Sequence, residues 1–140
     1  MTSQTLCYNI VVMIPRSETS MAVYRQSFID RLTRQRDERE AYRLQALAKI
    51  QAGLPAVASG FSSVRRVYLF GSILRAGQFH AKSDVDIGVV GVTAEEYFAL
   101  WRELEAAFPE RPVDLRDVSK PSFFADTIQK TGLLIYERTN

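Results

Sequence analysis

The chain has 140 residues, 46% hydrophobic and 24% charged, a composition typical of one folded globular domain. Its formal net charge of +2 excludes a strongly basic molecule, so we expect no direct nucleic-acid binding. No apolar run reaches the ~18 residues that span a membrane, and the one cysteine, Cys7, excludes an internal disulfide and favours a reducing, cytoplasmic setting.

The first 20 residues include the apolar run TLCYNIVVMIP, which has no Lys or Arg before it. Because a secretory signal normally begins with basic residues, we interpret residues 1–20 as a leader, disordered or adding an edge strand. Met13 and Met21 are alternative start positions to Met1. We expect residues 21–140 to form a single domain.

Residues 21–51 lack Pro and Gly and predict a long helix, with Ser20 suited to cap its start. The late half carries apolar residues at helical spacing, whereas the stretch TRQRDERE (33–40) has none. We therefore expect the late half to pack on the core and the early half to be peripheral. The run AGLP (52–55) predicts a break or kink, followed by a short helical turn to Ser59.

The remaining elements alternate in type. Strands are predicted at 63–70, 85–90, 111–118 and 133–137, and helices at 93–108, capped by Thr93, and at 121–132, beginning at Pro121 and ending at Gly132. An aromatic and apolar stripe in the first of these helices is typical of core packing rather than of a cofactor site. This order indicates an α/β (α+β) fold in which helices cover a sheet.

Two aspartates, Asp84 and Asp86, lie at positions i and i+2 beside the predicted strand 85–90 and so share one face. Carboxylates this close repel each other, and a divalent cation such as Mg²⁺ relieves the repulsion. An isolated pair of this kind is equally compatible with a solvated strand end.

The preceding loop strengthens the metal hypothesis. Gly71 ends the strand 63–70 with a permissive backbone, and Ser72 adds a hydroxyl and an N–H. The following SILR predicts a helix whose N-terminus favours phosphate, and Arg75 adds a charge that binds phosphate oxygens. Together with the aspartates, this predicts a site for a nucleoside triphosphate and metal.

A third carboxylate is predicted in the strand 111–118. Asp114 lies between Val113 and Leu115, where a carboxylate is costly unless it has a role. Asp117, nearer the strand end, is interpreted as a turn or cap residue. The single histidine, His80, is interpreted as a solvent-facing loop residue.

The combined pattern LFGS…R…G…SDVDIGVV followed by VDLRDV resembles the minimal nucleotidyltransferases of the DNA polymerase β superfamily. The resemblance covers roughly residues 45–137 and implies a nucleotidyltransferase fold with a small mixed sheet, preceded here by a long N-terminal helix. The family usually has ten residues between Gly-Ser and the aspartate pair, and here residues 73–83 make eleven. The extra residue separates Arg75 from Gly77 and puts the role of Arg75 in question.

By this resemblance, Gly71, Ser72 and Arg75 would bind the triphosphate of ATP. Asp84 and Asp86 would hold Mg²⁺, with two ions expected. Asp114 would be the third carboxylate, binding metal and activating the acceptor hydroxyl.

The resemblance extends to the MntA-type antitoxins that accompany HEPN-domain ribonuclease toxins. The resemblance implies AMP transfer from ATP to a tyrosine of the toxin. Because no second substrate domain is evident in the sequence, we expect another protein to present the acceptor. Two alternatives stay open: a nucleotidyltransferase for a small molecule such as an aminoglycoside, and a non-catalytic module that blocks a toxin through the long helix.

Overall fold

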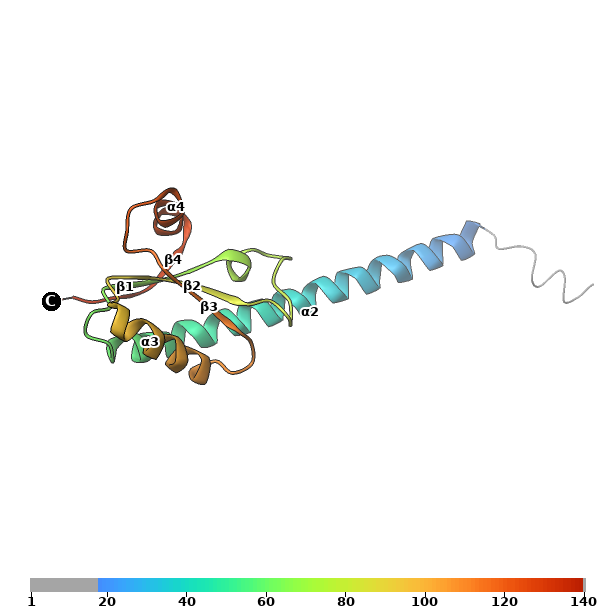
Figure 1. The fold of residues 1–140 in the computed structure, drawn as a ribbon. Helices are drawn as coiled ribbons and strands as arrows, with labels where there is room; N and C mark the ends of the chain where they lie inside the picture. Colours follow the sequence, from blue (N-terminus) through green and yellow to red (C-terminus); the bar gives the residue numbers. More distant parts are fainter. Residues whose placement is uncertain (1–17, 140) are drawn as a thin grey trace, which may run out of the picture. The chain divides into compact units, whose positions relative to one another are not determined.

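The computed structural model describes residues 18–139 of the chain. Its elements, labelled in Figure 1, are α2 (Glu18–Ser59), β1 (Arg66–Phe70), the 3₁₀ turn η1 (Gly71–Leu74), β2 (Val85–Val90), α3 (Ala94–Ala107), β3 (Val113–Asp117), α4 (Phe123–Thr131) and β4 (Leu133–Glu137). The chain divides into two compact units, one up to Asp37 and one from Glu38 onward. Most of the predicted leader, residues 1–17, lies outside the described residues.

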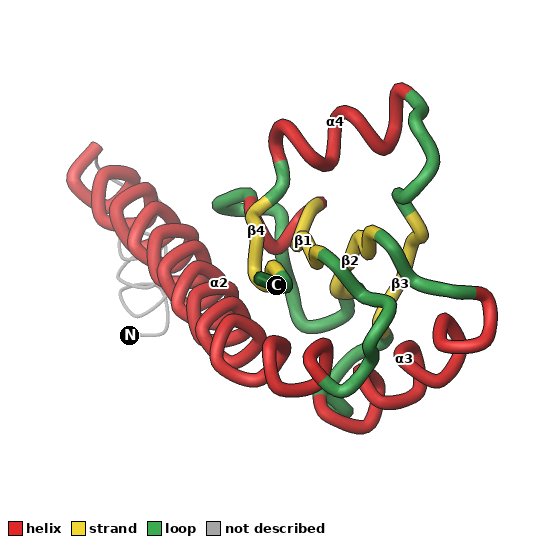
Figure 2. Tube along the Cα trace, turned by 90° about the vertical axis from the view of Figure 1, so that its left-hand side faces the viewer, coloured by secondary structure: helices red, strands yellow, loops and turns green. Residues whose placement is uncertain are grey.

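The strands of residues 18–139 form one mixed four-stranded sheet in the order β3-β2-β1-β4, which confirms the predicted fold class. Strand β1 pairs antiparallel with β2 and with β4, whereas β2 pairs parallel with β3. Within the unit from Glu38, α3 lies on one side of this sheet and α4 on the other (Figure 2). The parallel pair β2–β3 is joined by α3, as a parallel connection requires.

The main core lies between the sheet and the pair of helices α2 and α3. Alternate residues of β1, β2 and β3 face it and are almost completely buried: Val67, Leu69, Val85, Ile87, Val89, Val113 and Leu115. From α2 it receives Ile50, Leu54 and Ala58, and from α3 it receives Leu100 and Leu104. The predicted stripe of α3 is therefore core packing, and Trp101 also donates its indole N–H to the Val113 carbonyl at 2.9 Å.

A smaller core lies on the opposite face, beneath α4. It contains Tyr68 and Val90 from the sheet together with Ala125 and Ile128 from α4. Gly88 permits this packing, because a Cβ at that position would lie 3.2 Å from Cγ2 of Ile128. Within residues 18–139 only a short helix covers this face, and Asp84 at its edge is exposed.

Of the break or kink predicted at residues 52–55, the break is wrong, because α2 continues to Ser59 with Pro55 inside it. Leu54 is fully buried, and a Cβ at Gly53 would lie 3.3 Å from the ring of Phe108. A proline in a helix removes one backbone hydrogen bond, at a cost of about 3 kcal/mol. Burial of the flanking residues on the core offsets this local preference.

Smaller differences concern element ends. Strand β1 begins at Arg66 rather than at residue 63, and α4 begins at Phe123 with Ser122, not Pro121, at its start. The Ser122 hydroxyl accepts a hydrogen bond from the Ala125 N–H at 3.0 Å. The Thr93 cap is confirmed, since its hydroxyl accepts from the Glu96 N–H.

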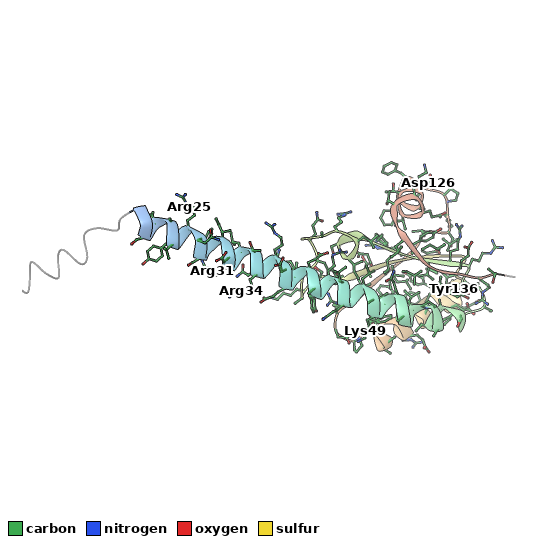
Figure 3. All side chains as sticks on the ribbon, turned by 180° about the vertical axis from the view of Figure 1, so that it is seen from behind. Arg25, Arg31, Arg34, Lys49, Asp126 and Tyr136 are labelled. Atoms are coloured by element: carbon green, nitrogen blue, oxygen red, sulfur yellow. The ribbon has the colours of Figure 1, made fainter. Side chains whose placement is uncertain are left out.

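The part of α2 that precedes Glu38 is exposed, as predicted for the peripheral half of the helix. Phe28, Ile29 and Leu32 are each about half exposed, and the Arg31 guanidinium lies 5.4 Å from the centre of the Phe28 ring. Arg25, Arg31 and Arg34 project from this segment in Figure 3. No helix within residues 18–139 is long and apolar enough to cross a membrane.

Candidate active site

Gly71 forms the turn that ends β1. Its φ is +78°, in the left-handed region that L-residues rarely adopt. A Cβ at Gly71 would collide with Oδ2 of Asp86 and lie 3.1 Å from its Cγ. Glycine is therefore required here both by the backbone angle and by the carboxylate beside it.

Ser72 follows in the short turn η1, which ends when Arg75 returns to an extended conformation. The predicted helix after Gly-Ser is wrong, because these residues form only the four-residue turn Gly71–Leu74. A turn this short has no substantial helix dipole, so any attraction of phosphate must come from individual N–H groups and side chains.

The three predicted carboxylates lie on neighbouring strands. Asp84 is exposed directly before β2, and Asp86 is half buried within it. Asp114 is half buried on β3 and is the direct register partner of Asp86. On the other side, Phe70 pairs with Asp86 in the β1–β2 register. The sheet thus brings Gly71, Asp86 and Asp114 to one place on its open face.

The electrostatics of this cluster centre on Asp86. Burial raises the pKa of the Asp86 carboxyl above its usual range, and the negative charges of Asp114 and Asp84 raise it further. Arg116 and Arg75 oppose this shift. A carboxylate that is partly desolvated and surrounded by like charges favours a bound cation.

Asp114 is held by Arg116, a residue that sequence reasoning missed. The guanidinium Nε and Nη2 donate to the two carboxylate oxygens of Asp114 at 3.1 and 3.3 Å. The sequence contained the information needed to predict this pair, because Asp114 and Arg116 are residues i and i+2 of one strand and therefore share a face. With Asp114 turned to Arg116, no group of three metal-binding side chains converges within residues 18–139.

Asp84 and Asp86 nevertheless fit a divalent cation. Both are hard oxygen donors on one face of a strand, and Asp86 has like-charged neighbours that a cation would neutralise. Mg²⁺ commonly uses one or two carboxylates and completes its ligand sphere with substrate phosphates and water. Asp114 would join such a site only after exchanging Arg116 for the metal.

The other predicted residues are more peripheral. Arg75 is exposed and donates to the side chain of Gln78 at 3.3 Å, within the same loop. His80 is exposed, as predicted. Asp117 accepts from the Ser119 N–H at 3.0 Å and is the turn residue that was predicted.

A cavity of about 200 Å³ lies away from these carboxylates, lined by residues that include Tyr42, Ile50, Val85 and Phe108. Val85 alternates with Asp84 and Asp86 along the chain, so the cavity belongs to the opposite face of the sheet. The candidate site is therefore an open surface and not this cavity.

Comparisons with known proteins find a matching family model and solved structures with a similar fold. The family model described as "Polymerase beta, Nucleotidyltransferase" matches residues 54–140. A solved structure of a toxin–antitoxin with AMP-PNP is similar with a TM-score of 0.52 and 22% identity, over 63% of this chain and 73% of that chain. A mutant of the toxin–antitoxin MntA–HpeT is similar with a TM-score of 0.51 and 20% identity, over the same shares. No curated protein matches the chain.

Proposed function

The chain belongs to the polymerase β nucleotidyltransferase family, and on that premise we propose that it transfers AMP from ATP to a tyrosine hydroxyl of a partner HEPN-type toxin. Such a transfer would neutralise the toxin and make this protein an antitoxin. The observation that carries the proposal is the register of the sheet, which sets Asp86 directly beside Asp114 and against Gly71.

Each residue has a chemical role in this proposal. The backbone N–H groups of Gly71 and Ser72, and the guanidinium of Arg75, bind the triphosphate. Asp84 and Asp86 hold Mg²⁺, which neutralises the developing phosphate charge when it is bound. Asp114 accepts the proton of the acceptor hydroxyl. The hydroxyl oxygen bonds to the α-phosphorus, the bond from that phosphorus to the bridging oxygen breaks, and pyrophosphate leaves.

Arg116 has a supporting role before catalysis. Because it pairs with Asp114 on an exposed surface, it neutralises one of the three carboxylates while no metal is bound. Exchange of this exposed ion pair for a metal carries a small cost, since surface pairs contribute about 1 kcal/mol or less.

The class of acceptor is supported by the solved structures that the chain is similar to. Both are toxin–antitoxins, and one of them contains AMP-PNP, an analogue of ATP. The open surface around Asp86 and Asp114 also leaves room for a protein acceptor beside bound ATP.

The test is a transfer assay with α-labelled ATP, Mg²⁺ and the product of the neighbouring gene. We expect wild-type protein to label the partner and Asp84→Asn to lose the label. Asp126→Asn is the matched control, because Asp126 is an exposed acidic residue of α4 (Figure 3). An unlabelled partner with the wild type, or full labelling by Asp84→Asn, would refute the proposal.

The same assay separates the alternatives. Label on an added aminoglycoside, with none on the partner, would favour a small-molecule nucleotidyltransferase. A toxin neutralised equally well by the Asp84→Asn/Asp86→Asn double variant would favour a non-catalytic binding module.

A further inference from the structure

Arg43 connects α2 to the turn that carries Ser72. Its side chain is only 12% exposed, and its Nη1 donates to the carbonyl of Ile73 at 2.8 Å. Its Nε donates to Glu40 at 3.0 Å, and this pairing raises the pKa of the guanidinium. Arg43 is thus fixed by a neighbour on its own helix while it binds the residue directly after Ser72.

Arg111 connects the start of β3 to the other end of the same loop. It is the one charged residue of the described chain that is buried, with 9% of its surface exposed. Its Nη1 donates to the carbonyls of His80 and Ser83, both at 3.3 Å, and its Nη2 donates to the hydroxyl of Tyr42. Ser83 directly precedes Asp84.

Aromatic rings enclose the Arg111 guanidinium. Its central carbon lies 4.4 Å from the ring centre of Phe79 and 4.9 Å from that of Tyr42. Phe79 is fully buried although it belongs to the loop. Within residues 18–139 Arg111 forms no salt bridge, so carbonyl oxygens and rings stabilise its charge. Burial of a charge is costly unless hydrogen bonds satisfy it, so Arg111 stabilises the loop only while its contacts with these carbonyl groups are kept.

Between these two contacts the buried side chains of Ile73 and Phe79 hold the loop on the core, and its own backbone bonds are short-range. Its internal backbone bonds include Gln78 N–H to Arg75 O at 3.3 Å and Ser83 N–H to His80 O at 3.0 Å. Gly77 is exposed and is reached from α2 by the Arg39 guanidinium at 3.4 Å. Contacts from outside the loop therefore determine its conformation at both ends.

We propose that Arg43 and Arg111 are positioning residues that clamp the loop of residues 71–84, so that Ser72 and Asp84 face one triphosphate and its metal. Arg43 fixes the phosphate end through Ile73, and Arg111 fixes the metal end through Ser83. The inference rests on the proposed function and assigns a role to two residues that touch neither substrate nor metal.

Substitutions of Arg43 and of Arg111 should change two different measured quantities. Arg43→Gln should raise the KM and Kd for Mg·ATP by roughly tenfold, because it removes the charge-assisted hydrogen bond to the Ile73 carbonyl. Arg111→Lys should raise the Mg²⁺ concentration needed for half-maximal labelling by roughly threefold to tenfold, because an ammonium cannot reproduce the guanidinium fork that binds two carbonyls and a hydroxyl. Arg43→Lys, which keeps a positively charged donor, should recover most of the ATP affinity.

The experiment combines titration calorimetry with Mg·ATP, the transfer assay at varied ATP and Mg²⁺, and thermal melting of each variant. Arg102→Gln is the control, because Arg102 is exposed on α3. Hydrogen exchange of the ligand-free protein adds a readout that needs no substrate, and the amides of residues 71–84 should exchange faster in Arg43→Gln than in the control.

If the variants fold and keep wild-type Mg·ATP affinity, Mg²⁺ dependence and hydrogen exchange of the loop, the positioning role of Arg43 and Arg111 is refuted. The proposed function is not affected by that result. A wild-type protein that binds no Mg·ATP would instead overturn the proposed function, and the clamp's role in nucleotide binding with it.

Discussion

The two faces of the sheet are built from the same strands and differ in almost every other respect. One face presents aliphatic residues such as Leu69 and Ile87 to α2 and α3, and it is closed to water. The other presents Asp86, Asp114 and Gly88, and in the described part of the chain only α4 covers part of it. Alternation along each strand produces both faces from one segment of sequence.

The difference shows how stability and chemistry are separated in a small domain. The closed face supplies hydrophobic stabilisation, whereas the open face holds like charges together at a cost. Substitutions on the closed face should therefore mainly lower stability, whereas substitutions on the open face should mainly lower activity.

The largest effect should follow from removing one charge on the open face. Asp86→Asn should lower AMP transfer at least ~1,000-fold, because a metal ligand at the site of phosphoryl transfer contributes about 4 kcal/mol or more to transition-state stabilisation. The measurement is the initial rate of labelling at saturating ATP and Mg²⁺. If Asp86→Asn retained a tenth of the wild-type rate, Asp86 would not be a ligand of the metal.

The same substitution should stabilise the metal-free fold. The pKa of Asp86 is raised in the folded chain above its ordinary value of 3.8, so the folded state prefers the protonated carboxyl. The associated stability is present below that ordinary value and is lost as pH rises through the raised value. At pH 7 the melting temperature of Asp86→Asn should exceed that of the wild type by about 1–3 °C, and the gain should vanish at pH 3. An equal gain at both pH values would show that charge is not its cause.

The closed face should respond in the opposite way. Leu54→Ala should lower the free energy of unfolding by about 3–5 kcal/mol, because Leu54 is fully buried between α2 and the sheet. Leu44→Ala on the same helix is the control, since Leu44 is 49% exposed and its loss should cost less than about 1 kcal/mol. Urea denaturation measures both. Equal losses would mean that the end of α2 is not part of the core.

Alanine substitutions at two glycines, Gly71 and Gly77, test the open face by a smaller difference. Gly71 and Gly77 have similar φ values of +78° and +81°, so alanine at either should cost about 1–2 kcal/mol of stability. Only at Gly71 would the new Cβ meet Asp86, because at Gly77 no atom of residues 18–139, its chain neighbours aside, lies within 4 Å of the Cβ position. Gly71→Ala should therefore lose transfer activity while Gly77→Ala keeps most of it. Equal transfer activity in the two variants would show that Gly71 is not part of the active site.

Local sequence determined much of this protein. Alternation of apolar and polar residues predicts β2 and β3, and spacing of i and i+2 places Asp84 and Asp86 on one face. The Thr93 cap and the core stripe of α3 also follow from short-range pattern, because each depends on residues within a few positions of one another.

Tertiary structure decided the rest. AGLP (52–55) has the local preference of a helix break, yet burial of Leu54 and contact of Gly53 with Phe108 keep α2 continuous. The contacts of Arg43 with Ile73, of Arg111 with Ser83 and Tyr42, and of Asp86 with the turn at Gly71 join residues far apart in the chain. No local pattern encodes such contacts, because they exist only after the sheet and α2 have packed together.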